Sequence, residues 1–144
     1  MCKPNMRIDA WPPFEKAPVF VEWEERIRRL ASFPKTYIKL SGAFSEIPPL
    51  STHNVNEPWI LTDELIEAKS HVSCWVLSVF QIFGPERVMF GSDWPVCNVG
   101  GGGGKVAWRN WRGLVDSYLQ DLLLSEREKQ AVWSGNAAKA YRIF

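Results

Sequence analysis

The sequence lacks the features that mark several large classes of protein. It has three cysteines, Cys2, Cys74 and Cys97, too few and too widely spaced for the disulfide framework of a small secreted domain. No apolar run reaches the roughly 18 residues that span a bilayer, and the first residues show neither the charged nor the apolar region of a signal peptide. These absences predict a cytoplasmic chain with reduced thiols and no membrane partner.

The sequence also lacks the charge and histidine patterns that nucleic acids and metal ions require. The 17 Lys and Arg residues are mixed with 16 Asp and Glu residues, and the net charge of +1 leaves no basic stripe for a phosphate backbone. Nucleic acid is therefore not expected as a partner. His53 and His71 are the two histidines, and the sequence contains no C-x-x-C or H-x-H pair, so no complete metal site is visible in it.

The residues that are present indicate a folded α/β chain. With 46% hydrophobic residues, eight Trp and eight Phe among 144 residues, a core or a large interface must exist, and the length suggests one domain over residues 1–144. Hydrophobic periodicity and breakers predict two strands among several helices. The helices are expected at Val19–Phe33, Asp63–Phe83, Trp108–Leu124, Ser125–Gly135 and Asn136–Tyr141, the strands at Thr36–Ser41 and Arg87–Phe90, and a long loop at Glu46–Trp59.

This order of elements is typical of β/α units, in which crossover helices connect parallel strands. We expect the two strands to lie side by side and parallel, with their carboxyl ends at one rim. Two strands do not close a sheet, so either the fold is a fragment or partners supply the rest.

Asp93 is the strongest candidate for a catalytic residue. It follows a buried strand in Gly91-Ser92-Asp93-Trp94-Pro95, and catalytic groups of parallel β/α folds gather at the carboxyl ends of the strands. The alternative is a turn-forming aspartate that hydrogen-bonds its own backbone. Two-residue alternation would place Met89, Gly91 and Asp93 on one face, toward a barrel mouth.

Other polar residues have weaker signals. Lys39 and Ser41 share one face of the first strand. From there Lys39 would stabilise a substrate carboxylate or an oxyanion. The alternative is that Lys39 pairs with neighbouring acidic side chains inside the barrel and has no role in catalysis. The run Gly100–Gly104 before Lys105 lacks the hydroxyl of a phosphate loop, since Val106 follows, and we interpret it as a flexible linker or mobile lid.

Two histidines and one cysteine receive ordinary interpretations. His53 lies in the long loop, from which it would reach a substrate. His71 is interpreted as a surface or core residue of a helix, and Cys97 as a small buried residue.

Four stretches together resemble the amidohydrolase-related family, which includes metal-dependent hydrolases and lactonases. They resemble that family's eighth strand, its seventh strand, its closing helix and the tail of an aspartate-histidine-x-x-lysine-proline motif. In this order, they are Phe90-Gly91-Ser92-Asp93-Trp94-Pro95, Tyr37-Ile38-Lys39-Leu40-Ser41-Gly42, Trp133-Ser134-Gly135-Asn136-Ala137-Ala138-Lys139-Ala140-Tyr141 and Met1-Cys2-Lys3-Pro4.

The resemblance implies the C-terminal part of a (β/α)8 TIM barrel, incomplete in this chain, and a hydrolase. Water would attack a cyclic ester or amide of a small organic acid, with Asp93 as the base and Lys39, Ser41 and Trp94 as substrate contacts. The family's histidine metal ligands have no counterpart here. The cofactor is therefore open, and Asp93 would ligate a divalent metal such as zinc only if a full-length form binds one.

A non-catalytic remnant is the alternative from another class of function. Uncovered parallel strands expose backbone donors, acceptors and apolar faces, so such a chain would act through self-association at its sheet edges or by binding a partner.

Overall fold

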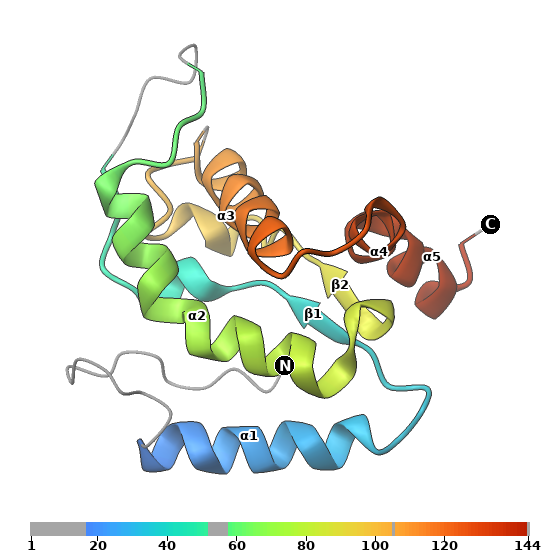
Figure 1. Cartoon of the computed structure of the whole chain (residues 1–144). Coiled ribbons are helices and arrows are strands. Elements are labelled where there is room, and N and C mark those ends of the chain that lie inside the picture. Colours follow the sequence, from blue (N-terminus) through green and yellow to red (C-terminus); the bar gives the residue numbers. More distant parts are fainter. Residues whose placement is uncertain (1–16, 52–57, 105, 144) are drawn as a thin grey trace. The chain divides into compact units, whose positions relative to one another are not determined.

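The structure is a computed structural model that describes residues 17–51, 58–104 and 106–143. Met1-Cys2-Lys3-Pro4 and His53 lie outside these residues. None of the described helices is long and apolar enough to cross a membrane. The helices and strands of Figure 1 are α1 (Pro18–Ala31), β1 (Ile38–Leu40), α2 (Asp63–Phe83), β2 (Val88–Phe90), α3 (Ala107–Asp121), α4 (Glu126–Gln130) and α5 (Asn136–Tyr141).

The chain divides into two compact units that alternate along the sequence. The first unit comprises Met1–Leu40, Cys74–Phe90 and Leu124–Phe144, and the second comprises Ser41–Ser73 and Gly91–Leu123. Helix α2 begins in the second unit and ends in the first. The organisation as one domain over residues 1–144 stays a prediction.

The sheet of the first unit confirms the predicted parallel pairing. β1 and β2 pair in parallel with Ile38 opposite Val88 and Leu40 opposite Phe90, so both strands end at the same rim (Figure 1). Each strand has three residues and is shorter than the apolar run that predicted it. Val88 is fully buried and Met89 is 5% exposed, as expected for a strand whose two faces are both covered.

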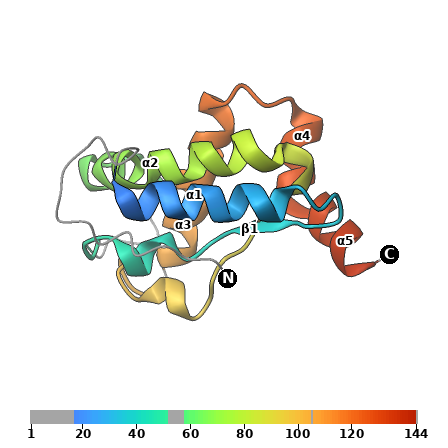
Figure 2. The same ribbon diagram turned by 90° about the horizontal axis from the view of Figure 1, so that it is seen from below.

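An aromatic cluster joins α1 to the second half of α2 in the first unit. The centroid of the Trp75 ring lies 4.8 Å from that of Phe20 and 4.9 Å from that of Trp23, and both pairs have the T-shaped geometry that aromatic rings favour. The Ser78 hydroxyl donates to the Glu24 carboxylate at 3.0 Å. Figure 2 shows α1 running beside α2.

The buried stripe of α1 is narrower than the sequence predicted. Helical spacing places Trp23, Ile27, Leu30 and Ala31 on one stripe of this helix. Phe20, Trp23 and Ile27 are buried, whereas Leu30 is 39% exposed. Leu30 is one turn beyond Ile27, and by that point the helix is approaching its end at Ala31.

The two C-terminal helices begin as predicted, and the second ends at Tyr141 as predicted, but no break separates them at Gly135. Ser125-Glu126-Arg127-Glu128 has the spacing of a capping box, and the structure confirms it: the Ser125 hydroxyl accepts from the Glu128 amide, and the Glu128 carboxylate accepts from the Ser125 amide. Gly135 does not end the helix. It has φ −61° and closes a π-helical turn, Ala131–Gly135, from which α5 continues.

Asn136 anchors this helical segment to β2. Its side chain is 5% exposed, and Nδ2 donates to the backbone carbonyls of Pro85 and Val88, both at 2.7 Å. The Trp133 ring lies 4.7 Å from the Phe90 ring at the other end of the same strand. The strand that leads to Asp93 is thus held at both ends within the first unit.

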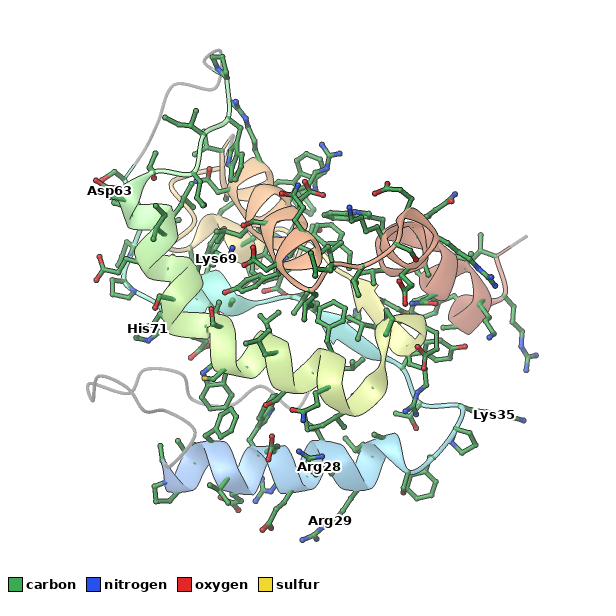
Figure 3. The ribbon with its side chains drawn as sticks, viewed as in Figure 1. Arg28, Arg29, Lys35, Asp63, Lys69 and His71 are labelled. Atoms are coloured by element: carbon green, nitrogen blue, oxygen red, sulfur yellow. The ribbon has the colours of Figure 1, made fainter. Side chains whose placement is uncertain are left out.

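In the second unit, Lys69 joins the first half of α2 to α3. Its ammonium group donates to the Ser117 hydroxyl at 2.5 Å and lies 2.6 Å from the Asp121 carboxylate. The Tyr118 hydroxyl donates to the Lys69 carbonyl. Figure 3 shows Lys69 on the side of α2 that faces α3, with His71 on the other side. This network explains why a lysine side chain is only 16% exposed here.

Candidate active site around Asp93

Asp93 lies in the second unit, three residues beyond the end of β2, and is half-buried. Its φ is +57°, the left-handed region that aspartate tolerates better than most residues. The strand has therefore ended before Asp93, and the expected alternation of Met89, Gly91 and Asp93 does not extend to it. The direction of its side chain is set by a turn rather than by the pleat of a strand.

Local hydrogen bonds define that turn. The Trp94 amide donates to the Ser92 hydroxyl at 3.3 Å, and the Cys97 amide donates to the Asp93 carbonyl at 3.0 Å. The Trp94–Pro95 peptide bond is cis, and a short 3₁₀ turn, Val96–Asn98, follows. Asp93 therefore forms a turn through its backbone, and neither of these hydrogen bonds uses its carboxylate.

The Cys97 thiol is the titratable neighbour of Asp93. Burial, and after it the negative charge of Asp93, raise the pKa of the Cys97 thiol above its ordinary value. Cys97 is 3% exposed, which confirms the interpretation as a small buried residue. A thiol kept neutral in this way is a poor nucleophile and a poor metal ligand.

Trp94 presents an exposed aromatic surface directly after Asp93. Its side chain is 71% exposed, and Val96 and Val99 on the same loop are 46% and 64% exposed. An exposed aromatic ring at this position offers an apolar face to a ligand. Contact of Trp94 with a substrate stays a prediction.

Along the sequence, the first unit ends at Leu40 and the second begins at Ser41, so Lys39 and Ser41 belong to different units. Lys39 is exposed in the middle of β1, opposite Met89 in the register, whereas Leu40 is buried. Ser41 is half-buried and directly follows the strand. Lys39 belongs to the first unit and Asp93 to the second, so the expected place of Lys39 beside Asp93 stays a prediction.

The glycine run after Asp93 is a close-packed turn, so its interpretation as a flexible linker or mobile lid was wrong. Gly101 and Gly102 are buried, and the Gly100 carbonyl accepts from the Leu50 amide at 2.8 Å. A Cβ on Gly101 would overlap the Cys97 carbonyl and the Phe44 ring. Gly102 has φ +91°, and a Cβ there would lie 2.9 Å from the Ser51 carbonyl. Glycine is required here for close approach.

Two consecutive side chains of α3 bind the two ends of the loop that carries Asp93. The Trp111 indole Nε1 donates to the Gly91 carbonyl at 2.9 Å, and the Asn110 Nδ2 donates to the Gly101 carbonyl at 3.1 Å. Both side chains are buried, at 2% and 4% exposure. Sequence reasoning missed both. The one available signal was a polar residue, Asn110, one turn before Leu114 on the apolar face of the helix.

A cavity of about 240 Å³ lies elsewhere in the second unit, and Asp93 does not line it. His71 lines its wall and is half-buried. Beside it, the Glu64 carboxylate accepts from the Ser51 amide at 2.9 Å. The remaining lining residues are Ile47, Pro48, Pro49, Leu50, Glu67 and Ala68.

The described residues around Asp93 do not by themselves make a complete metal centre. Within residues 17–51, 58–104 and 106–143, no three His, Cys, Asp or Glu side chains are grouped as a metal ion requires. Asp93 would supply one oxygen donor, and the neutral Cys97 thiol adds none. No step of the chemistry below is therefore assigned to a metal held by these residues.

An aspartate at the end of a parallel strand, in a fold of alternating strands and helices, places the chain among the β/α proteins whose sites lie at strand carboxyl ends. Comparison with known proteins identifies the family. Residues 10–143 match the model of the family described as amidohydrolase, and the chain belongs to that family.

Curated relatives of this chain are lactonases. The L-rhamnono-gamma-lactonase of Scheffersomyces stipitis is 28% identical over 144 residues, which cover 99% of this chain and 39% of that protein. The L-fucono-1,5-lactonase of Burkholderia multivorans is 31% identical over 121 residues, which cover 84% of this chain and 35% of that protein. The chain thus spans well under half the length of these relatives.

The fold agrees with a solved amidohydrolase. The crystal structure of an amidohydrolase from Burkholderia multivorans with bound zinc matches with a TM-score of 0.65 and 28% identity, over 97% of this chain and 41% of that chain. A second crystal structure of an amidohydrolase from the same organism, with bound HEPES, gives a TM-score of 0.60. The predicted fold class, α/β with parallel strands as part of a barrel, is confirmed.

Proposed function

We propose that this chain serves in the hydrolysis of a lactone of a small sugar acid, with Asp93 as the general base. The observation that carries the proposal is the position of Asp93: a half-buried carboxylate, held on a turn, directly beyond a strand of a parallel pair. The curated relatives that act on sugar lactones support the choice of substrate class.

The proposed reaction needs a general base, groups that stabilise the negative charge that develops on the carbonyl oxygen, and a surface that contacts the sugar ring. The Asp93 carboxylate takes a proton from water as the water oxygen bonds to the lactone carbonyl carbon. The ring C–O bond then breaks, and the leaving alkoxide takes up a proton to give the open hydroxy acid. Trp94 offers its ring to the sugar, and Lys39 and Ser41 offer polar contacts to the carbonyl oxygen or the product carboxylate.

A divalent metal such as zinc would polarise the lactone carbonyl in a form that binds one. The described residues would contribute Asp93 to such a site. The further ligands would have to come from outside the described residues.

The test compares Asp93→Asn with the matched control Asp116→Asn, a half-buried aspartate of α3 whose carboxylate accepts from Gln120 at 2.9 Å. Each variant is made in the chain alone and in a fusion behind the part of the Burkholderia multivorans lactonase that precedes the matched region. Hydrolysis of L-fucono-1,5-lactone and L-rhamnono-gamma-lactone is followed by proton release. Asp93→Asn should lower kcat by about 10²- to 10⁴-fold, the typical contribution of a general base, while the control keeps its rate.

Retained turnover of Asp93→Asn in the active form would refute the proposal and leave Asp93 a turn-former. The second candidate function is self-association without catalysis, which the sheet favours because, in the described residues, β1 and β2 each have one edge without a strand partner. Size-exclusion chromatography with light scattering tests it. Concentration-dependent oligomers of a chain that is inactive both alone and in the fusion would support this second function.

A further inference from the structure

The loop from Gly91 to Gly101, called here the Asp93 loop, is bound at both ends by one short stretch of helix. Trp111 donates to the carbonyl of its first residue and Asn110 to the carbonyl of its last. These two consecutive residues, called here the α3 clamp, have no other role in the proposed chemistry. Both the clamp and the loop belong to the second unit.

The conformation of Asp93 depends on support from outside the loop. A non-glycine residue with positive φ is disfavoured on its own and persists only when its surroundings fix it. The bonds within the loop, from Trp94 to Ser92 and from Cys97 to Asp93, are local and move with it. The clamp instead ties the loop to a helix of 15 residues.

The side chains of the clamp suit this task. An indole N–H is a donor only, so Trp111 has one orientation in which it is satisfied, and its ring is fixed by a T-shaped contact with Phe44 at 5.5 Å. The Asn110 amide is 4% exposed, where an unpaired polar group is costly, so its bond to Gly101 is strongly favoured. Both donors are therefore held in place before any substrate arrives.

We propose that Asn110 and Trp111 are positioning residues: by binding both ends of the Asp93 loop, they keep Asp93 in the left-handed turn that presents its carboxylate. The importance of this for catalysis rests on the proposed function. The effect on the loop does not, and it can be measured without any activity.

The first readout is amide hydrogen exchange of the 144-residue chain by NMR. The Cys97 amide reports on the loop, because it donates to the Asp93 carbonyl. Trp111→Phe keeps an aromatic ring but loses the donor, and Asn110→Leu keeps the approximate shape but loses the amide. Each should raise the exchange rate of Cys97 at least about fivefold, the factor expected from one lost bond to a buried acceptor. Amides in the middle of α3 should change less than about twofold.

Trp108→Phe is the matched control, since Trp108 lies one turn earlier on α3 and is 46% exposed. It should leave the exchange of Cys97 unchanged. Unchanged Cys97 exchange in Trp111→Phe would overturn the proposal. A uniform rise over the whole second unit would overturn it too, because that result marks a general loss of stability.

The second readout is steady-state lactone hydrolysis by the active form. Trp111→Phe should lower kcat by about tenfold or more with an unchanged KM, because a misplaced base slows chemistry without weakening substrate binding. If Asp93→Asn keeps its activity, the proposed function fails, and the exchange data still decide whether the clamp fixes the loop. A kcat that stays at the wild-type value while Asp93→Asn is inactive would overturn the positioning role.

Discussion

Asn136 provides the sharpest test of how the strand before the site is held. Asn136→Ala removes two hydrogen bonds of 2.7 Å, to the carbonyls of Pro85 and Val88, from a side chain that is 5% exposed. A net hydrogen bond contributes about 1 kcal/mol, and an acceptor left unpaired in a buried place costs about 1–3 kcal/mol. A carbonyl has two lone pairs and keeps one for other partners. We therefore expect a loss of about 2–3 kcal/mol in the free energy of unfolding.

Urea unfolding followed by tryptophan fluorescence measures this loss. With a slope of about 1–3 kcal/mol per molar urea, the midpoint should fall by roughly 0.7–3 M at unchanged slope. Ser134→Ala is the control: Ser134 is exposed on the same helical segment, and its variant should stay within about 0.5 kcal/mol of wild type. A loss below about 0.5 kcal/mol for Asn136→Ala would refute the reasoning, because two buried bonds cannot be that weak.

Two further predictions concern the second unit and the last helices. A Cβ at Gly113 of α3 would overlap the Trp59 ring, so Gly113→Ala should lower Tm, because overpacking costs about 1–3 kcal/mol and the gain in helix propensity is roughly 1 kcal/mol. In a Trp59→Ala background, which removes the ring, the same change should raise Tm. The absence of this reversal would contradict the clash. Hydrogen bonds from Ser125 lower the pKa of the Glu128 carboxyl, so their stabilisation is present above the ordinary glutamate pKa and is lost as pH falls through the lowered one. In urea titrations, the gap between wild type and Ser125→Ala should be largest at pH 7 and should narrow in acid to the part that comes from the Glu128 amide, which donates to the Ser125 hydroxyl at every pH. A gap independent of pH would speak against the bond between the Ser125 hydroxyl and the Glu128 carboxylate.

The helices and strands could be predicted because their signals are local, and the parallel pairing followed from their order along the chain. Threonine before a helix and glycine after it are ordinary signals of helix ends. Thr62 accepts from the Leu65 amide at 3.3 Å at the start of α2, and Gly84, with φ +70°, follows its end. The runs Thr36–Ser41 and Arg87–Phe90 indicated the two strands, and their parallel pairing followed from the helix between them, since parallel neighbours need a crossover connection. The prediction that Gly135 ends the fourth helix was wrong: at φ −61° its backbone is ordinary helix, and α5 continues from it.

The contacts that hold the site could not be predicted from local patterns. Trp111 meets Gly91 across 20 positions and Asn136 meets Val88 across 48, and nothing in the spacing of single residues specifies such pairs. The glycine run was misinterpreted for a related reason. A flexible linker and a backbone packed against Phe44 both require residues without a Cβ, so composition alone does not distinguish them.

The left-handed backbone of Asp93 decides which substitution reports on its chemistry. At φ +57°, aspartate and asparagine are the non-glycine residues best tolerated, because their short polar side chains hydrogen-bond the nearby backbone. Alanine has no such bond, so Asp93→Ala would remove the carboxylate and strain the turn together. Asp93→Asn keeps the backbone preference and the approximate size and removes only the ability to take a proton. The turn role and the base role, which compete as explanations of the same residue in the sequence, are thus separated by a single isosteric change.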